Sequence, residues 1–538
     1  MIMINAITWL EVCAAGLVVY ITQRFLFTRN PAPLPPGPKP LPLVGNLFDI
    51  PVIKPWLTYA DWGKKYGDIT HIQVFGRHII LLNSVEAAVE MLDKKSAKYS
   101  DRPVFPMAGD LVGCKDSLPL LSYGDRFREI RKHFHRVIGT RTAIEEYYGI
   151  KAVEIHKFLR RILIDPERLD THIRVTVGAI ILRISHGYQV KETNDYFINL
   201  AEQAVDIFGK ATAPGAFLVD SIPILKYVPE WFPGTGFKRK AREWKVVIDE
   251  LLDRPYQFVK DQMEAGIAPK SYTSVLLDGR CSSLSEKEVY VIKWSAASFY
   301  GAGTDTTAAA IHSMFLAMTL YPEVQKKAQA EIDAIIGLDR LPTLSDRQSL
   351  PYIEALVKEI HRWHVVSSLD VCLSSALIGF PHRVSEEDIH DGYYIPKGSL
   401  VIPNLWFMLH NPRSFSGPME FRPERFLVHG DKQPEHDPRT ACFGFGRRLV
   451  YLPWSIVVTQ DLLNTMLAGS LLGDALLWLL TAMTLAVFDI TKAIEDGKEI
   501  TPEIDSLSGA VSRTKPFRCS IQPRSTKALE LIQQDIQC

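Results

Sequence analysis

The sequence predicts one large, mainly α-helical domain with small β-sheets, preceded by a single N-terminal transmembrane helix. Apolar residues recur at helical spacing in residues 323–337 and 352–364. Short runs rich in β-branched residues at 69–74 and 78–82 predict strands near the start of this domain. With 538 residues, of which 47% are hydrophobic, the chain can bury a sizeable core.

Charge and cysteine content exclude several classes of protein. Lysine plus arginine and aspartate plus glutamate each number 61, so the basic excess of a nucleic-acid-binding protein is missing. The seven cysteines form no closely spaced pairs. The sequence therefore contains no zinc-binding pattern and argues against a scaffold held by disulfide bonds. The bulk of the chain is therefore expected in a reducing compartment.

Residues 1–29 are interpreted as a membrane anchor. The run 2–21 is mostly apolar with Glu11 as its one charge, and about 20 helical residues span a bilayer. Arg24 and Arg29 follow and favour a cytosolic location for the rest of the chain. A cleaved signal peptide is the alternative, but the run has no basic start and no clear cleavage site.

A proline-rich hinge is predicted at residues 30–46, since proline fixes φ and lacks a donor. Residues 47–538 then form the main domain. Within it, the apolar run 475–488 is about 14 residues long, too short for a membrane span, and is predicted as a buried helix.

Three separated motifs carry candidate chemistry. In residues 302–307, a glycine and consecutive threonines loosen a long helix predicted over 289–321, and Asp305 beside Thr306 could pass protons to a ligand. Close packing on a neighbouring helix is the alternative explanation. Glu359 and Arg362 share a helix face at i, i+3, as many solvated pairs do. The motif 421–426 adds Arg425, which could close a buried network on Glu359.

These motifs in this order, followed by Phe-Gly-Phe-Gly-Arg-Arg at 443–448, resemble the cytochrome P-450 family of haem-thiolate monooxygenases. The resemblance runs from Leu34 to about Pro523 and implies the cytochrome P-450 fold. A proline-rich hinge after an anchor is typical of microsomal members. The segment 231–234 is similar to fungal, particularly basidiomycete, members.

The resemblance also implies roles for single residues. Asp305 and Thr306 match the acid–alcohol pair that delivers protons during catalysis, and Glu359, Arg362 and Arg425 match the structural triad. Three residues match partners of the haem propionates: Arg131, His382 and Arg448. Phe127 replaces the tryptophan that usually precedes Arg131 by four positions, and for His382 an ordinary surface loop histidine is the alternative.

The family pattern breaks at the iron ligand. Its cysteine position holds Val450, which has no atom that can bind a metal, so no metal ligand is assigned. Cys442 lies eight residues too early to replace it without a rebuilt loop. Residues 449–468 look like an insertion, and 368–376 like a second one. The first has about the length of a translated short fungal intron, and an artefact of gene prediction or splicing explains both; a natural splice variant and a degenerate paralogue are the alternatives.

The implied function is NADPH-dependent insertion of one oxygen atom from dioxygen into a hydrophobic small molecule, in fungal secondary or xenobiotic metabolism. Haem is the implied cofactor, and NADPH acts through a cytochrome P-450 reductase. The basic run Arg126–Arg136 would suit an acidic docking surface on that reductase. An ordinary solvated face is the alternative explanation of this run. Apolar segments at 105–111, 217–219 and 231–232 would line a substrate route or simply pack. The implied location is the endoplasmic reticulum membrane, with the domain in the cytosol. The alternative is an inactive, haem-free remnant or variant.

Overall fold

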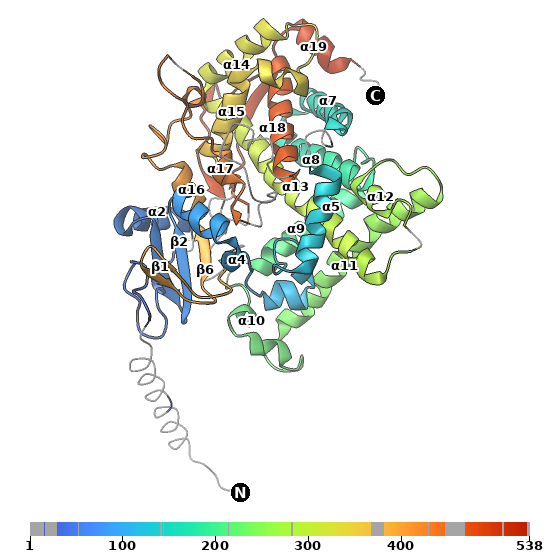
Figure 1. The fold of residues 1–538 in the computed structure, drawn as a ribbon. Helices are drawn as coiled ribbons and strands as arrows, with labels where there is room; N and C mark the ends of the chain where they lie inside the picture. Colours follow the sequence, from blue (N-terminus) through green and yellow to red (C-terminus); the bar gives the residue numbers. More distant parts are fainter. Residues whose placement is uncertain are drawn as a thin grey trace.

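The computed structural model describes Gly16 and residues 30–534, apart from residues 52, 140–142, 144, 214, 281–282, 367–380, 429, 447–467 and 508–510. Helices dominate this part of the chain (Figure 1). The larger helices are α2 (Pro55–Tyr66), α5 (Asp125–Ile138), α7 (Tyr148–Ile164), α8 (Leu169–His186), α9 (Tyr196–Thr212), α11 (Gly236–Glu264), α13 (Glu286–Leu320), α14 (Pro322–Ile335), α15 (Pro351–Trp363), α18 (Ala468–Val487) and α19 (Thr526–Gln533). The shorter ones are α3 (Val85–Ala88), α4 (Ser96–Tyr99), α10 (Leu218–Ser221), α12 (Tyr272–Leu277), α16 (Leu405–Leu409) and α17 (Arg439–Cys442).

Four small sheets accompany the helices in the described part of the chain. The largest has the order β1-β2-β6-β3, formed by Ile69–Val74, Arg77–Leu82, Leu400–Pro403 and His382–Arg383. A second has the order β11-β7-β8, formed by Cys519–Pro523, Phe488–Glu495 and Lys498–Ile500. Two pairs complete the set: β4 (Asp388–His390) with β5 (Tyr393–Ile395), and β9 (Ser506–Leu507) with β10 (Arg513–Thr514).

The predicted elements are confirmed closely. The strands expected at 69–74 and 78–82 pair as the antiparallel hairpin β1–β2, with Ile72 opposite Ile79. The helices expected at 323–337 and 352–364 are α14 and α15. The apolar run at 475–488 forms most of α18, whose side chains from Leu472 onward are largely buried, as expected of a core helix.

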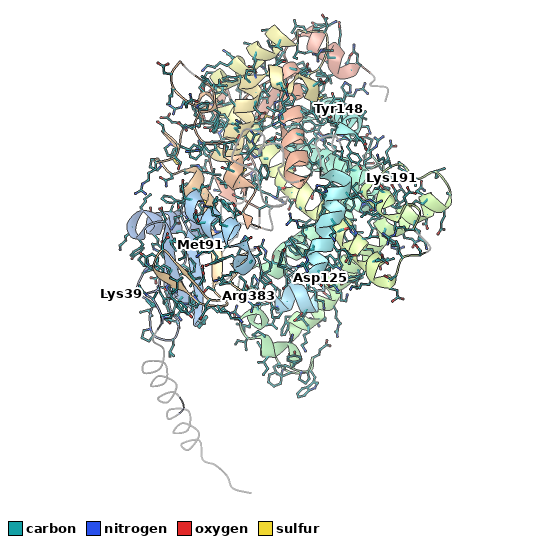
Figure 2. The ribbon with its side chains drawn as sticks, viewed as in Figure 1. Lys39, Met91, Asp125, Tyr148, Lys191 and Arg383 are labelled. Carbon is teal, nitrogen blue, oxygen red and sulfur yellow. The ribbon has the colours of Figure 1, made fainter. Side chains whose placement is uncertain are left out.

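Helix α13 forms the axis of the molecule (Figure 1). It packs against α8, α18 and α5 and begins at a capping box, in which Ser285 and Glu288 satisfy each other's backbone N–H groups. Figure 2 separates the two halves of the fold: Met91 and Arg383 lie on the side of the main sheet, while Lys191 and Tyr148 lie in the helical half. Any site that uses α13 therefore has helices on one side and the sheet on the other.

The proline-rich hinge is docked on the body and is not a free spacer. The amide of His71 donates to the Pro36 carbonyl at 2.9 Å, and that of Tyr394 donates to the Pro33 carbonyl at 2.8 Å. A Cβ at Gly37 would lie 1.9 Å from the His71 carbonyl oxygen, so only glycine permits this approach. As expected, the hinge contains no helix before Leu47.

Within the described residues, no helix is both long and apolar enough to cross a bilayer. The predicted anchor at 1–29 lies outside those residues except for Gly16, so its span is not among the helices described.

Candidate functional site

The predicted proton-delivery residues lie in the middle of α13, which is unbroken there. Thr306 is exposed, and its hydroxyl donates to the Ala302 carbonyl at 2.7 Å. Such i−4 bonding by a threonine slightly weakens and bends a helix. The alternative explanation, close packing on a neighbouring helix, also holds in part, because a Cβ at Gly303 would lie 3.0 Å from Ile181 Cδ1 on α8. Gly303 thus allows close helix packing while Thr306 faces outward one turn away.

The carboxylate of Asp305 is held by an arginine from the far end of the chain. Arg513 on β10 forms an ion pair with it at 2.6 Å. Two turns along α13, His312 bonds through Nδ1 to the hydroxyl of Thr514, the next residue of β10. Strand β10 therefore lies along the face of α13 that carries Asp305. The motif at 302–307 gives no signal for this partner, because the pairing depends on tertiary packing.

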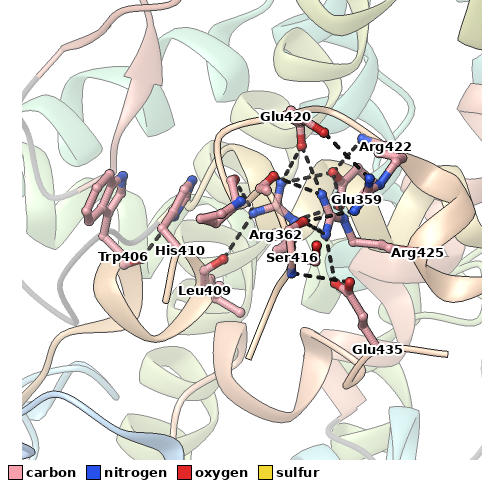
Figure 3. A network of polar contacts seen from close by, with 12 residues as sticks. Glu359, Arg362, Trp406, Leu409, His410, Ser416, Glu420, Arg422, Arg425 and Glu435 are labelled. Carbon is pink, nitrogen blue, oxygen red and sulfur yellow. Dashed lines mark hydrogen bonds and ion pairs between the residues drawn. The ribbon is translucent and has the colours of Figure 1, made fainter. Parts of the chain in front are cut away.

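The structure brings the predicted triad together (Figure 3). Arg362 donates to both carboxylate oxygens of Glu359, from Nε at 2.7 Å and from Nη2 at 2.9 Å. Arg425 Nε lies 3.2 Å from Glu359 Oε2, and all three side chains have 0% exposure. This bidentate geometry is the strong form of an arginine–carboxylate pair. The network is therefore buried, as the resemblance implies, and not a solvated helix pair.

The two arginines of the triad also hold a long loop in place. Arg362 donates to the carbonyls of Leu409, Pro418 and Glu420, and Arg425 donates to that of Ser416 at 2.7 Å (Figure 3). Glu435 pairs with Arg425 Nη1 at 2.7 Å and supplies the second negative charge. The two guanidinium groups thus face two carboxylates, and the burial of the charges is compensated.

A second ionic cluster, centred on Asp474, was not predicted. Its carboxylate meets Arg347 at 2.5 Å, His361 at 3.3 Å and Arg439 at 3.4 Å. Burial alone would raise the pKa of Asp474, but these partners outweigh it and hold that pKa well below its usual range. Asp474 is on α18 and Arg439 on α17. The cluster therefore links by an ion pair the helices that precede and follow residues 447–467.

Two of the three candidates for propionate binding, Arg131 and His382, belong to the described residues. Arg131 lies on α5 with its guanidinium 5.9 Å from the Phe127 ring, and burial lowers the pKa of Arg131. His382 is 1% exposed, which corrects the surface alternative, and its Nδ1 donates to the Tyr99 carbonyl at 2.7 Å. Its Nε2 could donate to a carboxylate only if the ring were doubly protonated. Arg448 lies outside the described residues.

The glycine-rich turn is tied to the sheet side of the fold. The Gly446 amide donates to Asp93, whose pKa burial raises to about 6. Gly446 has φ +79°, and a Cβ there would lie 2.6 Å from the Leu92 carbonyl oxygen and 3.7 Å from His382 Cε1. Glycine is therefore required at 446, and His382 lies beside the start of the segment that holds the ligand position.

Comparison with known proteins identifies this arrangement. A model of the cytochrome P-450 family matches residues 35–449. The chain belongs to the cytochrome P-450 family. It is 48% identical to cytochrome P-450 monooxygenase 208 of Postia placenta, over 97% of each chain. It is also 45% identical to the cytochrome P-450 monooxygenase claR of Ampulloclitocybe clavipes, over 98% of this chain and 93% of that one.

A third relative, the cytochrome P-450 monooxygenase ppsD of Aspergillus oryzae, is 40% identical over 93% of this chain and 90% of its own. All three are fungal monooxygenases, so the family relationship extends to the class of reaction. The family match stops at Leu449, one residue before Val450 and at the start of the stretch that looks inserted.

Members of the cytochrome P-450 family use haem, and the donor set described in this chain fits only part of that group. Arg131 suits its carboxylates, and His382 would do so only as a doubly protonated ring, but the iron needs a thiolate. The three described cysteines lie elsewhere in the fold: Cys442 ends α17, before the glycine-rich turn, Cys519 lies on β11, and Cys114 precedes α5. None of the described cysteines therefore fits as the iron ligand, and Val450 cannot act as one.

Proposed function

We propose that this gene product is an NADPH-dependent monooxygenase that inserts one atom of dioxygen into a hydrophobic small molecule, in fungal secondary or xenobiotic metabolism. The observation that supports it is the retention of Thr306 and the ion-paired Asp305 in an unbroken α13, together with the fully buried Glu359 network. The haem-free alternative rests on Val450 and on the stretch 449–468 that looks inserted.

An apolar cluster beside α13 supports a hydrophobic substrate. Trp294 and Ala297 of α13 are buried in one cluster with Phe105, Met107 and Val219. Sites for small molecules are lined mainly by apolar and aromatic side chains, with few polar groups. The segments 105–111 and 217–219, expected to line a substrate route, thus lie in the same cluster as α13.

Electrons are proposed to come from a flavoprotein reductase that docks on the basic face of α5. Part of this face is already neutralised, since Arg126 pairs with Asp116 and Arg128 with Asp125. Arg128 is 51% and Asp125 97% exposed, so their pair is weak and open to exchange with an acidic partner. Charge complementarity of this kind mainly raises the association rate.

A membrane location is proposed from two features. One is the apolar run before the hinge, and the other is a group of exposed apolar side chains around α10: Leu218 at 70%, Ile224 at 70%, Tyr227 at 74% and Trp231 at 81% exposed. Large exposed apolar patches mark surfaces that bind partners or membranes. The two features would give the domain two contacts with the endoplasmic reticulum membrane.

Deleting residues 1–29 should leave part of the protein bound to microsomes, because the α10 surface remains. Adding Trp231→Glu to the deletion should release the rest, since a charge at an interfacial aromatic position opposes insertion. Flotation of both variants on lipid vesicles measures this. Glu243→Gln on the exposed side of α11 is the control for a surface change. Full-length protein that stays soluble without detergent would contradict the anchor.

The Thr306 hydroxyl is expected to control how much NADPH use yields product. In a version with a cysteine-bearing haem loop, Thr306→Ala should lower the product formed per NADPH consumed several-fold and release peroxide, because a positioned proton donor is lost. Thr319→Ala is a matched control, since Thr319 makes the same i−4 bond to Phe315 at 2.8 Å further along α13. Unchanged coupling in Thr306→Ala would leave Thr306 as a packing residue only.

A further inference from the structure

The glycine-rich turn, residues 443–446, lies against a segment from much earlier in the chain. This segment is the single π-helical turn η2 (Val89–Lys94), which follows α3. Such wide turns are rare and frequently occur at functional sites. Phe445 of the glycine-rich turn is 2% exposed and belongs to one apolar cluster with Met91 and Leu92 of η2. Two distant segments therefore meet at the start of the stretch that holds the ligand position.

Two backbone constraints fix Gly446 on η2. Its amide is buried and donates to Oδ1 of Asp93. A buried N–H group without an acceptor is costly, so this bond matters for the local conformation. A Cβ at Gly446 would lie 2.6 Å from the carbonyl oxygen of Leu92, so the two backbones are in direct contact. The peptide at Gly446 therefore cannot rotate or approach η2 more closely without losing the bond or colliding with that carbonyl.

The chain that follows Asp93 is itself firmly held. Lys95 pairs with Asp388 on β4 at 2.6 Å, and the hydroxyl of Tyr99 donates to the same carboxylate at 3.0 Å. The carbonyl of Tyr99 in turn accepts a hydrogen bond from Nδ1 of His382 at 2.7 Å. The carboxyl of Asp93 thus projects from a support that is tied to two other strands.

We propose that Asp93 is a positioning residue, whose carboxyl oxygen holds the glycine-rich turn in the conformation that the ligand position requires, before any haem is bound. Asp93 acts through Gly446 and is not itself placed against the cofactor. The carboxyl offers an acceptor oxygen whether it is ionised or neutral, so this role needs no particular charge. The consequence for haem binding rests on the proposed function, whereas the fixing of the turn does not.

Packing of Phe445 is the competing explanation for the position of the turn. The attraction between apolar side chains has no direction, so it limits where the turn lies but not how its peptide groups are oriented. A hydrogen bond depends strongly on direction and sets the orientation of the N–H group. The two explanations therefore differ in the expected effect of removing the Asp93 side chain.

Hydrogen exchange at the Gly446 amide tests the proposal in the unaltered 538-residue chain. Asp93→Ala should lower the protection of this amide about tenfold, the factor that corresponds to the loss of one hydrogen bond. Asp93→Asn keeps an acceptor oxygen and should keep the protection. Peptides from α14 should exchange equally in all variants, which separates a local effect from general unfolding.

Glu90→Ala is the matched control. Glu90 lies on the same π-helical turn, but its side chain is 49% exposed and pairs with Lys94. This variant should leave the exchange of Gly446 unchanged. Equal protection of Gly446 in Asp93→Ala and the wild type would overturn the proposal, as would an Asp93→Asn variant that exchanges as fast as Asp93→Ala.

A second readout uses the version in which residues 449–468 are replaced by a cysteine-containing haem loop. The fraction of this protein that gives a thiolate-type spectrum with carbon monoxide should fall several-fold in Asp93→Ala and be restored in Asp93→Asn. A loss of stability alone would not change that fraction in protein that remains folded. An undiminished fraction in Asp93→Ala would overturn the proposal. Absence of the spectrum from every version, with the expected exchange at Gly446, would instead count against the proposed function alone.

Discussion

The 538-residue chain should show no thiolate-type spectrum after reduction and addition of carbon monoxide. Valine at 450 offers the iron no ligand, and the nearest cysteine in the sequence, Cys442, belongs to α17, eight residues before the ligand position. A version in which residues 449–468 are replaced by a cysteine-containing haem loop should show that spectrum. Haem–thiolate formation should therefore be nearly complete in the version with the replaced loop and absent in the unaltered chain. This is the largest effect expected for this chain.

Cys442→Ser in the unaltered chain is the control that separates the possible ligands. A normal thiolate spectrum that disappears in Cys442→Ser would show that this cysteine reaches the iron after all. A normal spectrum that survives the substitution would point to another cysteine. Either result would contradict the argument from the missing ligand.

Glu359→Ala is expected to remove most of the stability of the domain. It would leave the guanidinium groups of Arg362 and Arg425 buried, and among the described residues Glu435 would be the carboxylate that remains paired with Arg425. Breaking a buried ion pair by removing one partner costs roughly 3–5 kcal/mol, which is a large part of the free energy of unfolding of a typical domain. Urea denaturation followed by circular dichroism would measure the loss.

Glu420→Ala is the matched control, because Glu420 is in the same loop and pairs with Arg422 at 3.6 Å, but its side chain is 67% exposed. It should cost less than about 1 kcal/mol. An unchanged denaturation midpoint for Glu359→Ala would rule out a stabilising role for the network.

Local pattern predicted the regular elements well. The bounds expected for α14, α15 and β1 agree with the structure within about two residues, because apolar spacing and proline positions act within one element. The triad was also predictable, since Glu359 and Arg362 are one turn apart and Arg425 belongs to a recognisable motif.

The remaining parts of the site depend on contacts between distant segments. Nothing near Asp305 indicates Arg513, and nothing near Asp93 indicates the Gly446 amide. The same is true of Asp474, whose partners come from three other elements. Such contacts are set by how helices and strands pack, which the spacing of residues within one segment does not encode.

The Asp474 cluster has a consequence for how this gene can change. Because it joins α17 to α18, the two ends of the segment between Cys442 and Ala468 are held close to each other. Closing a flexible segment between two fixed ends costs only about 0.6 kcal/mol of additional free energy for each doubling of its length. Folding therefore exerts little selection on the length of this segment, provided that the reading frame of α18 is kept. A splicing change that keeps this frame can abolish the chemistry while the rest of the domain still folds.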